Sequence, residues 1–149
     1  MTDHTESIVR QVMASETYRK AVATLAAEHD RTVEDIVTLT ETAAPSFQEE
    51  TRAGAFRAMA EAHGLRNVTI DAEGNVIGMR PGVGNGPLVC IAAHLDTVFP
   101  AGTDLTVRRE GTKLFAPGVG DDTRSLAVLL AWLRAPHRSR SCWPVSPRR

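Results

Sequence analysis

The pattern of apolar and polar positions predicts helices through most of the first 64 residues. From position 8 to 25, apolar side chains recur at spacings close to three and four: Ile8, Val12, Tyr18, Val22 and Leu25. The segment Thr32–Asp35 resembles a helix start, with two carboxylates at the positive end of the helix dipole, and Pro45 ends that helix. Ser46-Phe-Gln-Glu49 resembles a capping box for one more helix, which Gly64 closes.

After Gly64 the period becomes that of extended chain. Val68 and Ile70 alternate with polar residues, a turn signal follows, and an apolar pair at 76–77 returns, so a hairpin is predicted over about residues 67–80. A second hairpin is predicted from the segments 105–109 and 113–115.

Two continuous apolar runs predict buried elements. Leu88–Ala93 is typical of a strand buried on both faces, in which Cys90 would be an inert core thiol. Leu126–Leu133 is apolar almost all round and follows two acids, which predicts a buried helix. Helices that alternate with strands imply an α/β layer fold, and one of these strands is predicted to be wholly buried.

Composition narrows the class of protein. The chain has 149 residues, a size suited to one domain, and its 17 basic and 18 acidic side chains give a net charge of −1. This balance argues against general disorder and against steering toward nucleic acid. No stretch approaches the roughly 20 apolar residues of a membrane span, and the start of the chain does not resemble a secretory signal. With two cysteines, too few for a disulfide framework, we expect a soluble cytoplasmic protein.

Charge is unevenly distributed along the chain. All 18 acidic residues lie at or before Asp122, whereas residues 134–149 contain five arginines and three prolines. We expect a disordered tail there rather than an arm that binds nucleic acid or a membrane, because the tail has one aromatic residue and no ordered spacing. Loss of the reading frame near residue 134 is a further interpretation.

The first cluster with chemical potential is His94-Leu-Asp96, directly after the predicted buried strand. Open α/β sheets bind ligands at the carboxyl ends of their strands. Alternation along extended chain places His94 and Asp96 on the same side, and a metal-bound imidazole usually donates its second N–H to a carboxylate. The alternative is a structural hydrogen-bonded pair.

The second cluster is Gly118-Val-Gly-Asp121-Asp122, which ends at the start of the last predicted helix. One of the two acids can cap that helix, an interaction of about 0.5–2 kcal/mol. Capping needs only one acid, so the other is free to face a site, where a carboxylate can bridge two cations.

Together, His94-x-Asp96-Thr-Val98 and the Gly-x-Gly-Asp-Asp motif whose first acid lies 27 residues after His94 resemble the zinc-dependent M20 metallopeptidases. This family includes glutamate-releasing carboxypeptidases, tripeptide aminopeptidases, and acetylornithine and succinyl-diaminopimelate deacylases. The resemblance covers about residues 32–133. It implies the N-terminal part of an incomplete α/β catalytic domain, with helices packed on a mixed sheet, between a helical segment at 1–31 and the tail at 134–149.

The resemblance also implies roles for individual residues. His94 corresponds to a terminal ligand of one zinc ion and Asp121 to the carboxylate that bridges two ions. Asp96 belongs with the catalytic residues as the carboxylate that orients His94, and Asp122 is expected to be a cap or an outer group. The implied metal is zinc, with cobalt and manganese as alternatives, and no organic cofactor is expected. The implied substrate is a peptide or an N-acyl amino acid.

The sequence departs from the family after Asp122. Family members carry a general-base Glu, further ligands, a late His and an inserted lid domain downstream, but here no acid follows Asp122 and the later histidine is His137. We therefore expect a truncated, inactive front part of a larger enzyme. The alternative is a non-catalytic α/β module that self-associates or recruits a partner through an apolar helix surface made of Leu129, Leu130, Trp132 and Leu133.

Overall fold

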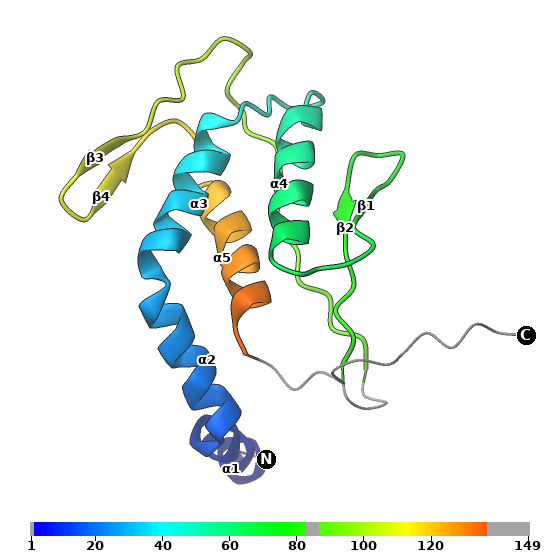
Figure 1. Ribbon diagram of the computed structural model, residues 1–149, viewed down its shortest axis with the longest axis vertical. Coiled ribbons are helices and arrows are strands. Elements are labelled where there is room, and N and C mark those ends of the chain that lie inside the picture. Colours follow the sequence, from blue (N-terminus) through cyan, green and yellow to red (C-terminus); the bar gives the residue numbers. More distant parts are fainter. Residues whose placement is uncertain (1, 83–86, 137–149) are drawn as a thin grey trace, which may run out of the picture.

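The computed structural model describes residues 2–82 and 87–136, in which five helices combine with two small sheets (Figure 1). The helices are α1 (Thr2–Ala14), α2 (Glu16–Ala27), α3 (His29–Glu41), α4 (Glu50–Ala62) and α5 (Thr123–Arg134). The strands are β1 (Thr69–Ile70), β2 (Val76–Ile77), β3 (Arg108–Glu110) and β4 (Lys113–Phe115). This confirms the prediction of an incomplete α/β domain.

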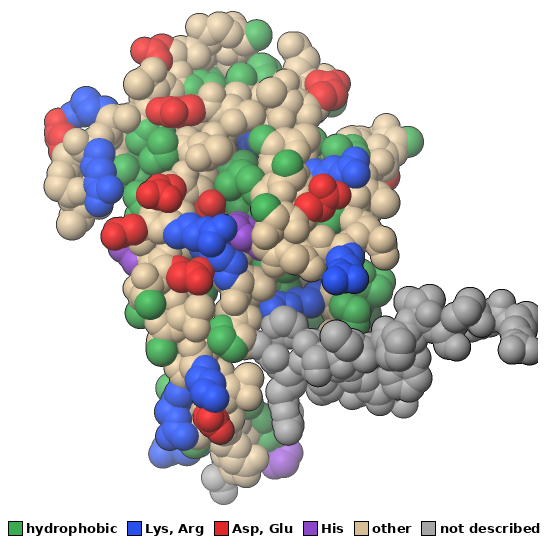
Figure 2. All heavy atoms as spheres, viewed as in Figure 1, with side chains coloured by type: hydrophobic (Ala, Val, Ile, Leu, Met, Phe, Trp, Pro, Cys, Tyr) green, Lys and Arg blue, Asp and Glu red, His purple; other side chains and the backbone are tan. Residues whose placement is uncertain are grey.

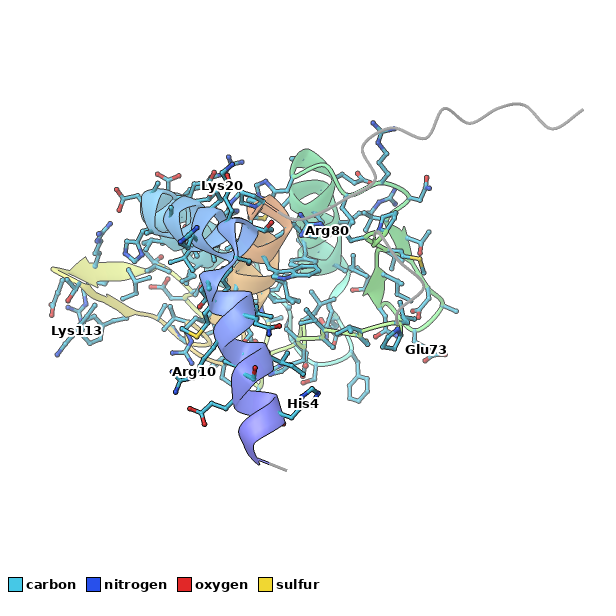
Figure 3. All side chains as sticks on the ribbon, turned by 90° about the horizontal axis from the view of Figure 1, so that it is seen from below. His4, Arg10, Lys20, Glu73, Arg80 and Lys113 are labelled. Carbon is cyan, nitrogen blue, oxygen red and sulfur yellow. The ribbon has the colours of Figure 1, made fainter. Side chains whose placement is uncertain are left out.

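The first three helices follow one another with one-residue breaks. Ser15 caps α2, because its hydroxyl oxygen accepts a hydrogen bond from the Tyr18 N–H at 3.2 Å. Helix α3 begins at His29, so the start predicted at Thr32 is wrong; the Thr32 hydroxyl instead donates to the Glu28 carbonyl at 3.2 Å, inside the helix. Helix α1 leads away from the rest of the helices, with His4 and Arg10 on it (Figure 3).

The core forms where α5 lies between α3 and α4 (Figure 1). Its fully or nearly buried members are Leu39, Phe56, Ala60, Val68, Leu126 and Leu130. The prediction of a buried helix is confirmed for one face of α5. The expected exposure of Leu130 is wrong, because this side chain is 0% exposed against α3 and α4, whereas Trp132 is 45% exposed as expected.

Both predicted hairpins are present. Strands β1 and β2 pair antiparallel with Thr69 opposite Ile77, and β3 and β4 pair antiparallel with Arg109 opposite Leu114. The hairpins lie on opposite sides of the helices, with Glu73 at the turn of one and Lys113 in the other (Figure 3). Gly64 follows His63, the capping residue at the end of α4, and has a φ of +87°, as predicted for a residue that closes a helix.

The predicted buried strand at Leu88–Ala93 is wrong. This segment joins no sheet in the described part of the chain, and Leu88, Val89 and Ile91 are 81%, 75% and 51% exposed. Cys90 is exposed too, so it is not a core thiol. An apolar run becomes a buried strand only when neighbouring strands and layers cover it, and the described residues supply none.

The predicted capping box at Ser46–Glu49 is also wrong. Glu49 precedes α4 without a side-chain capping bond, and its carboxylate accepts the Phe47 N–H at 2.6 Å. The Ser46 hydroxyl donates instead to Asp96 at 3.0 Å. Ser46 therefore connects this segment to the loop that carries Asp96.

Arg134, which ends α5, fastens this helix to α2 and α3. Its side chain is 5% exposed and forms ion pairs with Asp35 at 2.6 Å and Glu28 at 2.7 Å. It also donates to the Thr32 hydroxyl at 2.9 Å. Elsewhere on the face seen in Figure 2, basic and acidic side chains lie beside one another, with apolar side chains between them.

A disordered tail and the absence of a membrane span were also predicted from the sequence. The predicted tail lies outside the described residues from residue 137 onward, as do His137 and Cys142. Among the helices that the structure describes, none combines the length and apolarity needed to cross a bilayer. The three-part division of the chain stays a prediction.

Candidate metal centre

Two loops bring the candidate residues together. The His94 ring lies between two carboxylates: its Nδ1 is 3.1 Å from Oδ1 of Asp96, and its Nε2 is 3.0 Å from Oδ1 of Asp121. Nδ1 is also 3.0 Å from the Asp96 carbonyl oxygen. The structure thus brings the three residues singled out from the sequence into one cluster, across 27 residues of chain.

The partners of the His94 ring define its protonation. Two oxygens of Asp96 surround Nδ1, so this nitrogen carries a proton and donates it. In the neutral ring Nε2 then holds a lone pair, which faces a carboxylate oxygen of Asp121 at 3.0 Å. Two acceptors at this distance repel each other unless a proton or a cation lies between them. The hydrogen bond with Asp121 accordingly raises the pKa of His94 above its ordinary value, with Asp96 and Asp122 acting in the same direction.

Asp122 adds a third side chain that could bind a metal ion. One of its carboxylate oxygens accepts the backbone N–H of His94 at 3.3 Å and lies 3.9 Å from the ring Nε2. The peptide bond between Asp121 and Asp122 is cis. Two roles were predicted for Asp122, a cap or an outer group; the cap is wrong, because Asp122 occupies the capping position of α5 without a side-chain capping bond. His94, Asp121 and Asp122 offer ligand atoms that all lie within 4.8 Å of one another.

The local backbone explains why Asp121 and Asp122 face His94. Gly118 has a φ of +75°, and a Cβ at this position would lie 3.0 Å from Cγ2 of Thr97 in the other loop. Below it, the buried hydroxyl of Thr123 contacts the Gly118 carbonyl at 2.9 Å, the Val119 carbonyl at 3.2 Å and the Thr40 hydroxyl at 2.9 Å. These contacts fix the turn that leads into α5.

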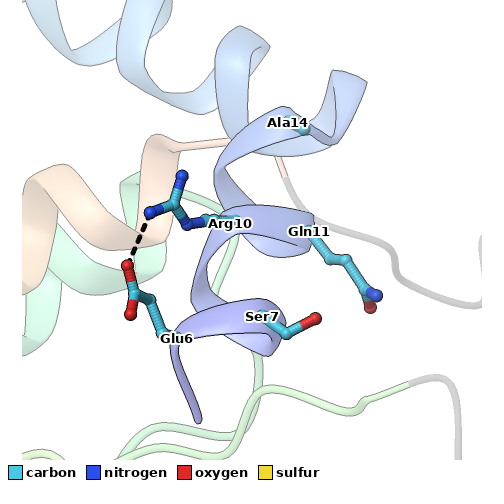
Figure 4. Close-up of a pocket in the computed structure, with 5 residues that line it drawn as sticks. All are labelled: Glu6, Ser7, Arg10, Gln11 and Ala14. Carbon is cyan, nitrogen blue, oxygen red and sulfur yellow. Dashed lines mark hydrogen bonds and ion pairs between the residues drawn. The ribbon is translucent and has the colours of Figure 1, made fainter. Parts of the chain in front are cut away.

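A cavity of about 330 Å³ opens at the cluster. His94, Asp96 and Asp121 form its polar part, and Val98, Phe99 and Val119 are among its apolar walls. A second hollow, lined by Glu6, Ser7, Arg10, Gln11 and Ala14, lies along α1 alone (Figure 4). Glu6 and Arg10 form an ion pair there, with 2.5 Å between Oε1 and Nη2, so this hollow offers no free charge for a ligand.

Sequence reasoning missed three residues that support the cluster: Ser46, Arg52 and Thr97. Ser46 bonds Asp96, and the fully buried Arg52 bonds the Leu95 carbonyl at 2.7 Å. An arginine in an amphipathic helix ordinarily faces solvent, so nothing in the pattern marked Arg52 as buried. The Pro-Ser segment at 45–46 was the available signal, because a Ser shortly before a predicted helix invites a search for the partner of its hydroxyl.

Comparison with known proteins gives one informative relative. No family model matches the chain. Over 101 residues the chain is 36% identical to a protein of Pyrococcus abyssi (strain GE5 / Orsay) named "Putative LysW-lysine/LysW-ornithine hydrolase". The match covers 68% of this chain and 28% of the relative, so the chain spans less than a third of the relative's length. The similarity supports a relationship to a family of hydrolases.

Proposed function

We propose that this chain carries part of the metal site of an M20-type amide hydrolase, a peptidase or N-acyl amino acid deacylase. The observation that carries the proposal is the meeting of His94, Asp121 and Asp122 beside Asp96. The similarity to a protein named as a hydrolase of lysine- and ornithine-containing substrates supports the reaction class.

The donor set fits zinc, with cobalt and manganese as alternatives. Imidazole nitrogen and carboxylate oxygens are zinc ligands, and catalytic zinc sites use three protein ligands and one open position. A cation near His94 Nε2 would also relieve the repulsion between this lone pair and Asp121. The Asp121 side chain is 93% exposed and meets His94 through one oxygen, which leaves room for a bridging role toward a second ion.

In this proposal each of the four residues at the site has a defined role. His94, Asp121 and Asp122 would hold the metal, and Asp96 would keep the Nδ1 proton of His94 in place. When bound, zinc polarises a scissile carbonyl and lowers the pKa of a water molecule. Val98, Phe99 and Val119, which line the cavity, would border the substrate.

We expect the isolated chain to bind zinc weakly and to hydrolyse no peptide or N-acyl amino acid. Amide hydrolysis needs a general base beside the reacting water. The carboxylates that line the cavity are Asp96 and Asp121, and both already face His94. The cytoplasmic localisation expected from the sequence stays a prediction.

Zinc affinity tests the proposal. Competition with a chromophoric chelator should give a dissociation constant that rises at least about tenfold in His94→Ala and in Asp121→Asn. His4→Ala, an exposed histidine on α1, is the matched control and should bind like the wild type. The proposal is wrong if the wild type binds no zinc, or if His94→Ala binds as tightly as the wild type while its circular dichroism is unchanged.

A second candidate function is an interaction module, and one observation favours it. The exposed apolar segment 88–91 is a surface on which another chain or a second copy can pack. The sequence placed this surface on the last helix, where burial of Leu130 argues against it.

A further inference from the structure

The loop that carries Asp96 is held by a segment about fifty residues earlier in the chain. The Thr97 N–H donates to the Ala44 carbonyl at 2.8 Å, and the Thr97 hydroxyl donates to the same oxygen at 3.3 Å. Pro45 and Thr97 also form a parallel β-bridge. Residues 42–46 therefore set the position of residues 95–97.

Arg52 ties these two segments together with one side chain. Its Nε donates to the Thr42 carbonyl at 2.8 Å, and its Nη1 donates to the Leu95 carbonyl at 2.7 Å. The residue is 1% exposed. A guanidinium has several donors in a rigid planar fork, so a single Arg52 fixes the spacing of both backbones, which a lysine ammonium cannot do.

Arg52 also carries a positive charge, which its hydrogen bonds to the Thr42 and Leu95 carbonyls do not by themselves require. A buried cation is costly unless an opposite charge compensates it. Within the described residues no carboxylate forms an ion pair with Arg52, and the group that acts on it electrostatically is Asp96, which opposes the lowering of the Arg52 pKa by burial.

Ser46 completes the environment of this carboxylate. Its hydroxyl donates to Oδ2 of Asp96 at 3.0 Å, while Oδ1 lies 3.1 Å from Nδ1 of His94. Both oxygens of Asp96 thus have a defined partner, and the carboxylate cannot rotate without losing one of them. The orientation of Asp96 in turn sets the plane of the His94 ring.

We propose that Ser46 and Arg52 are positioning residues that fix Asp96 and, through it, aim Nε2 of His94 at the metal. This inference rests on the proposed function, because it assigns these residues a task in the same site. It predicts that metal affinity depends on two side chains that touch no metal ligand directly.

Zinc binding to the full chain tests the inference through Ser46→Ala. We expect about a tenfold loss of zinc affinity, as for other residues that orient metal-bound histidines. The melting temperature of the metal-free protein should move by less than about 2 °C, because the Ser46 side chain is exposed. Ser46→Thr keeps the hydroxyl and should restore binding, and Ser7→Ala on α1 is the control.

Arg52 is tested in the same way by Arg52→Lys, with Arg57→Lys on the exposed face of the same helix as the matched control. We expect a loss of zinc affinity of about tenfold in the first variant only. Because Arg52→Lys alters a buried site, Ser46→Ala decides the matter if this variant does not fold.

The nitrogen-15 shifts of the His94 ring in the metal-free protein give a second readout. In neutral imidazole we expect the Nδ1–H tautomer in the wild type and a mixture of tautomers in Ser46→Ala. If the wild type binds zinc and Ser46→Ala binds it equally well, the inference fails while the proposed function stands. If the wild type binds no zinc, the proposed function fails, and an unchanged tautomer in Ser46→Ala would overturn the inference as well.

Discussion

Gly118 is the residue on which the two halves of the candidate site depend for their close approach. Its positive φ suits glycine, and its missing side chain leaves room for Thr97 from the opposite loop. Any larger residue would both strain the backbone and push the loops apart. Gly120, two residues on, has open space around it and no positive φ, so the pair offers an internal comparison.

Gly118→Ala should therefore lower the free energy of unfolding by about 1–2 kcal/mol, the cost of a left-handed conformation for a residue with a Cβ. Gly120→Ala should change it by less than about 0.5 kcal/mol. Urea unfolding followed by circular dichroism measures both values. Equal effects of the two substitutions would contradict this account of the turn.

The site shows which individual residues a sequence can reveal. The types and spacing of His94, Asp96 and Asp121 singled them out, and the structure brings the three side chains together, while their roles stay a prediction. Arg52 was not, because its burial depends on carbonyl groups of Thr42 and Leu95 that only the folded chain brings near. Asp122 was predicted to be a cap or an outer group; it makes no side-chain capping bond, and its carboxylate accepts the His94 N–H instead.

At the scale of elements, the contact of α2 and α3 with α5 contains a titratable group. His63, directly after α4, has Nδ1 3.3 Å from Nη2 of Arg31 and Nε2 3.1 Å from Nη1 of Arg134. Burial lowers the pKa of His63 most, and the two arginines lower it further against the opposite effect of Asp35 and Glu28. A protonated His63 would place a third positive charge in this cluster.

This shift gives a pH dependence with a defined sign. The unfolded chain protonates His63 near its ordinary pKa of about 6.5, whereas the folded chain resists protonation until a lower pH. Between these values the unfolded state binds more protons, so the free energy of unfolding should fall as the pH falls below about 6.5. His63→Gln should flatten this slope, and His4→Gln should leave it unchanged.

Urea unfolding at a series of pH values between about 5 and 8 measures the slope. A His63→Gln variant whose stability falls as steeply with acid as that of the wild type would show that other groups cause the dependence. Equal flattening by His4→Gln would show that the effect belongs to exposed histidines in general.

Most elements with local causes were predictable, and the element that needs distant partners was not. The hairpins at 69–77 and 108–115 follow from turn residues and alternation, and α5 follows from an apolar run of helical length. The segment 88–93 has the composition of a buried strand, but a strand exists only with partners, which the described residues do not provide. The missed start of α3 has a local cause, since the Thr32 hydroxyl bonds within the helix instead of capping it.

For the molecule as a whole, segment 88–91 concentrates apolar surface outside the core. Its side chains are largely exposed, so their replacement should change the free energy of unfolding little. The same exposure favours association between copies of the chain. The double substitution of Val89 and Ile91 by Lys should reduce self-association, and its free energy of unfolding should stay within about 0.5 kcal/mol of the wild-type value.

Size-exclusion chromatography with light scattering, over a range of protein concentrations, measures this effect. Phe47→Ser, a single exposed apolar residue outside the segment, is the control and should leave the mass distribution as in the wild type. A wild type that stays monomeric at all concentrations would remove the basis for an interaction function through this surface.

Helix α5 links the site to the far end of the molecule. Its twelve residues span about 18 Å, with Asp122 at one end and the buried Arg134 at the other. At that far end Arg80 donates to the Trp132 and Leu133 carbonyls and stacks on the Trp132 ring. These contacts, together with the ion pairs of Arg134, hold the C-terminal end of α5 in place. The segment that precedes α5 carries Asp121 and Asp122, so a contact made by Arg80 at one end of the helix bears on the position of two carboxylates at the other end.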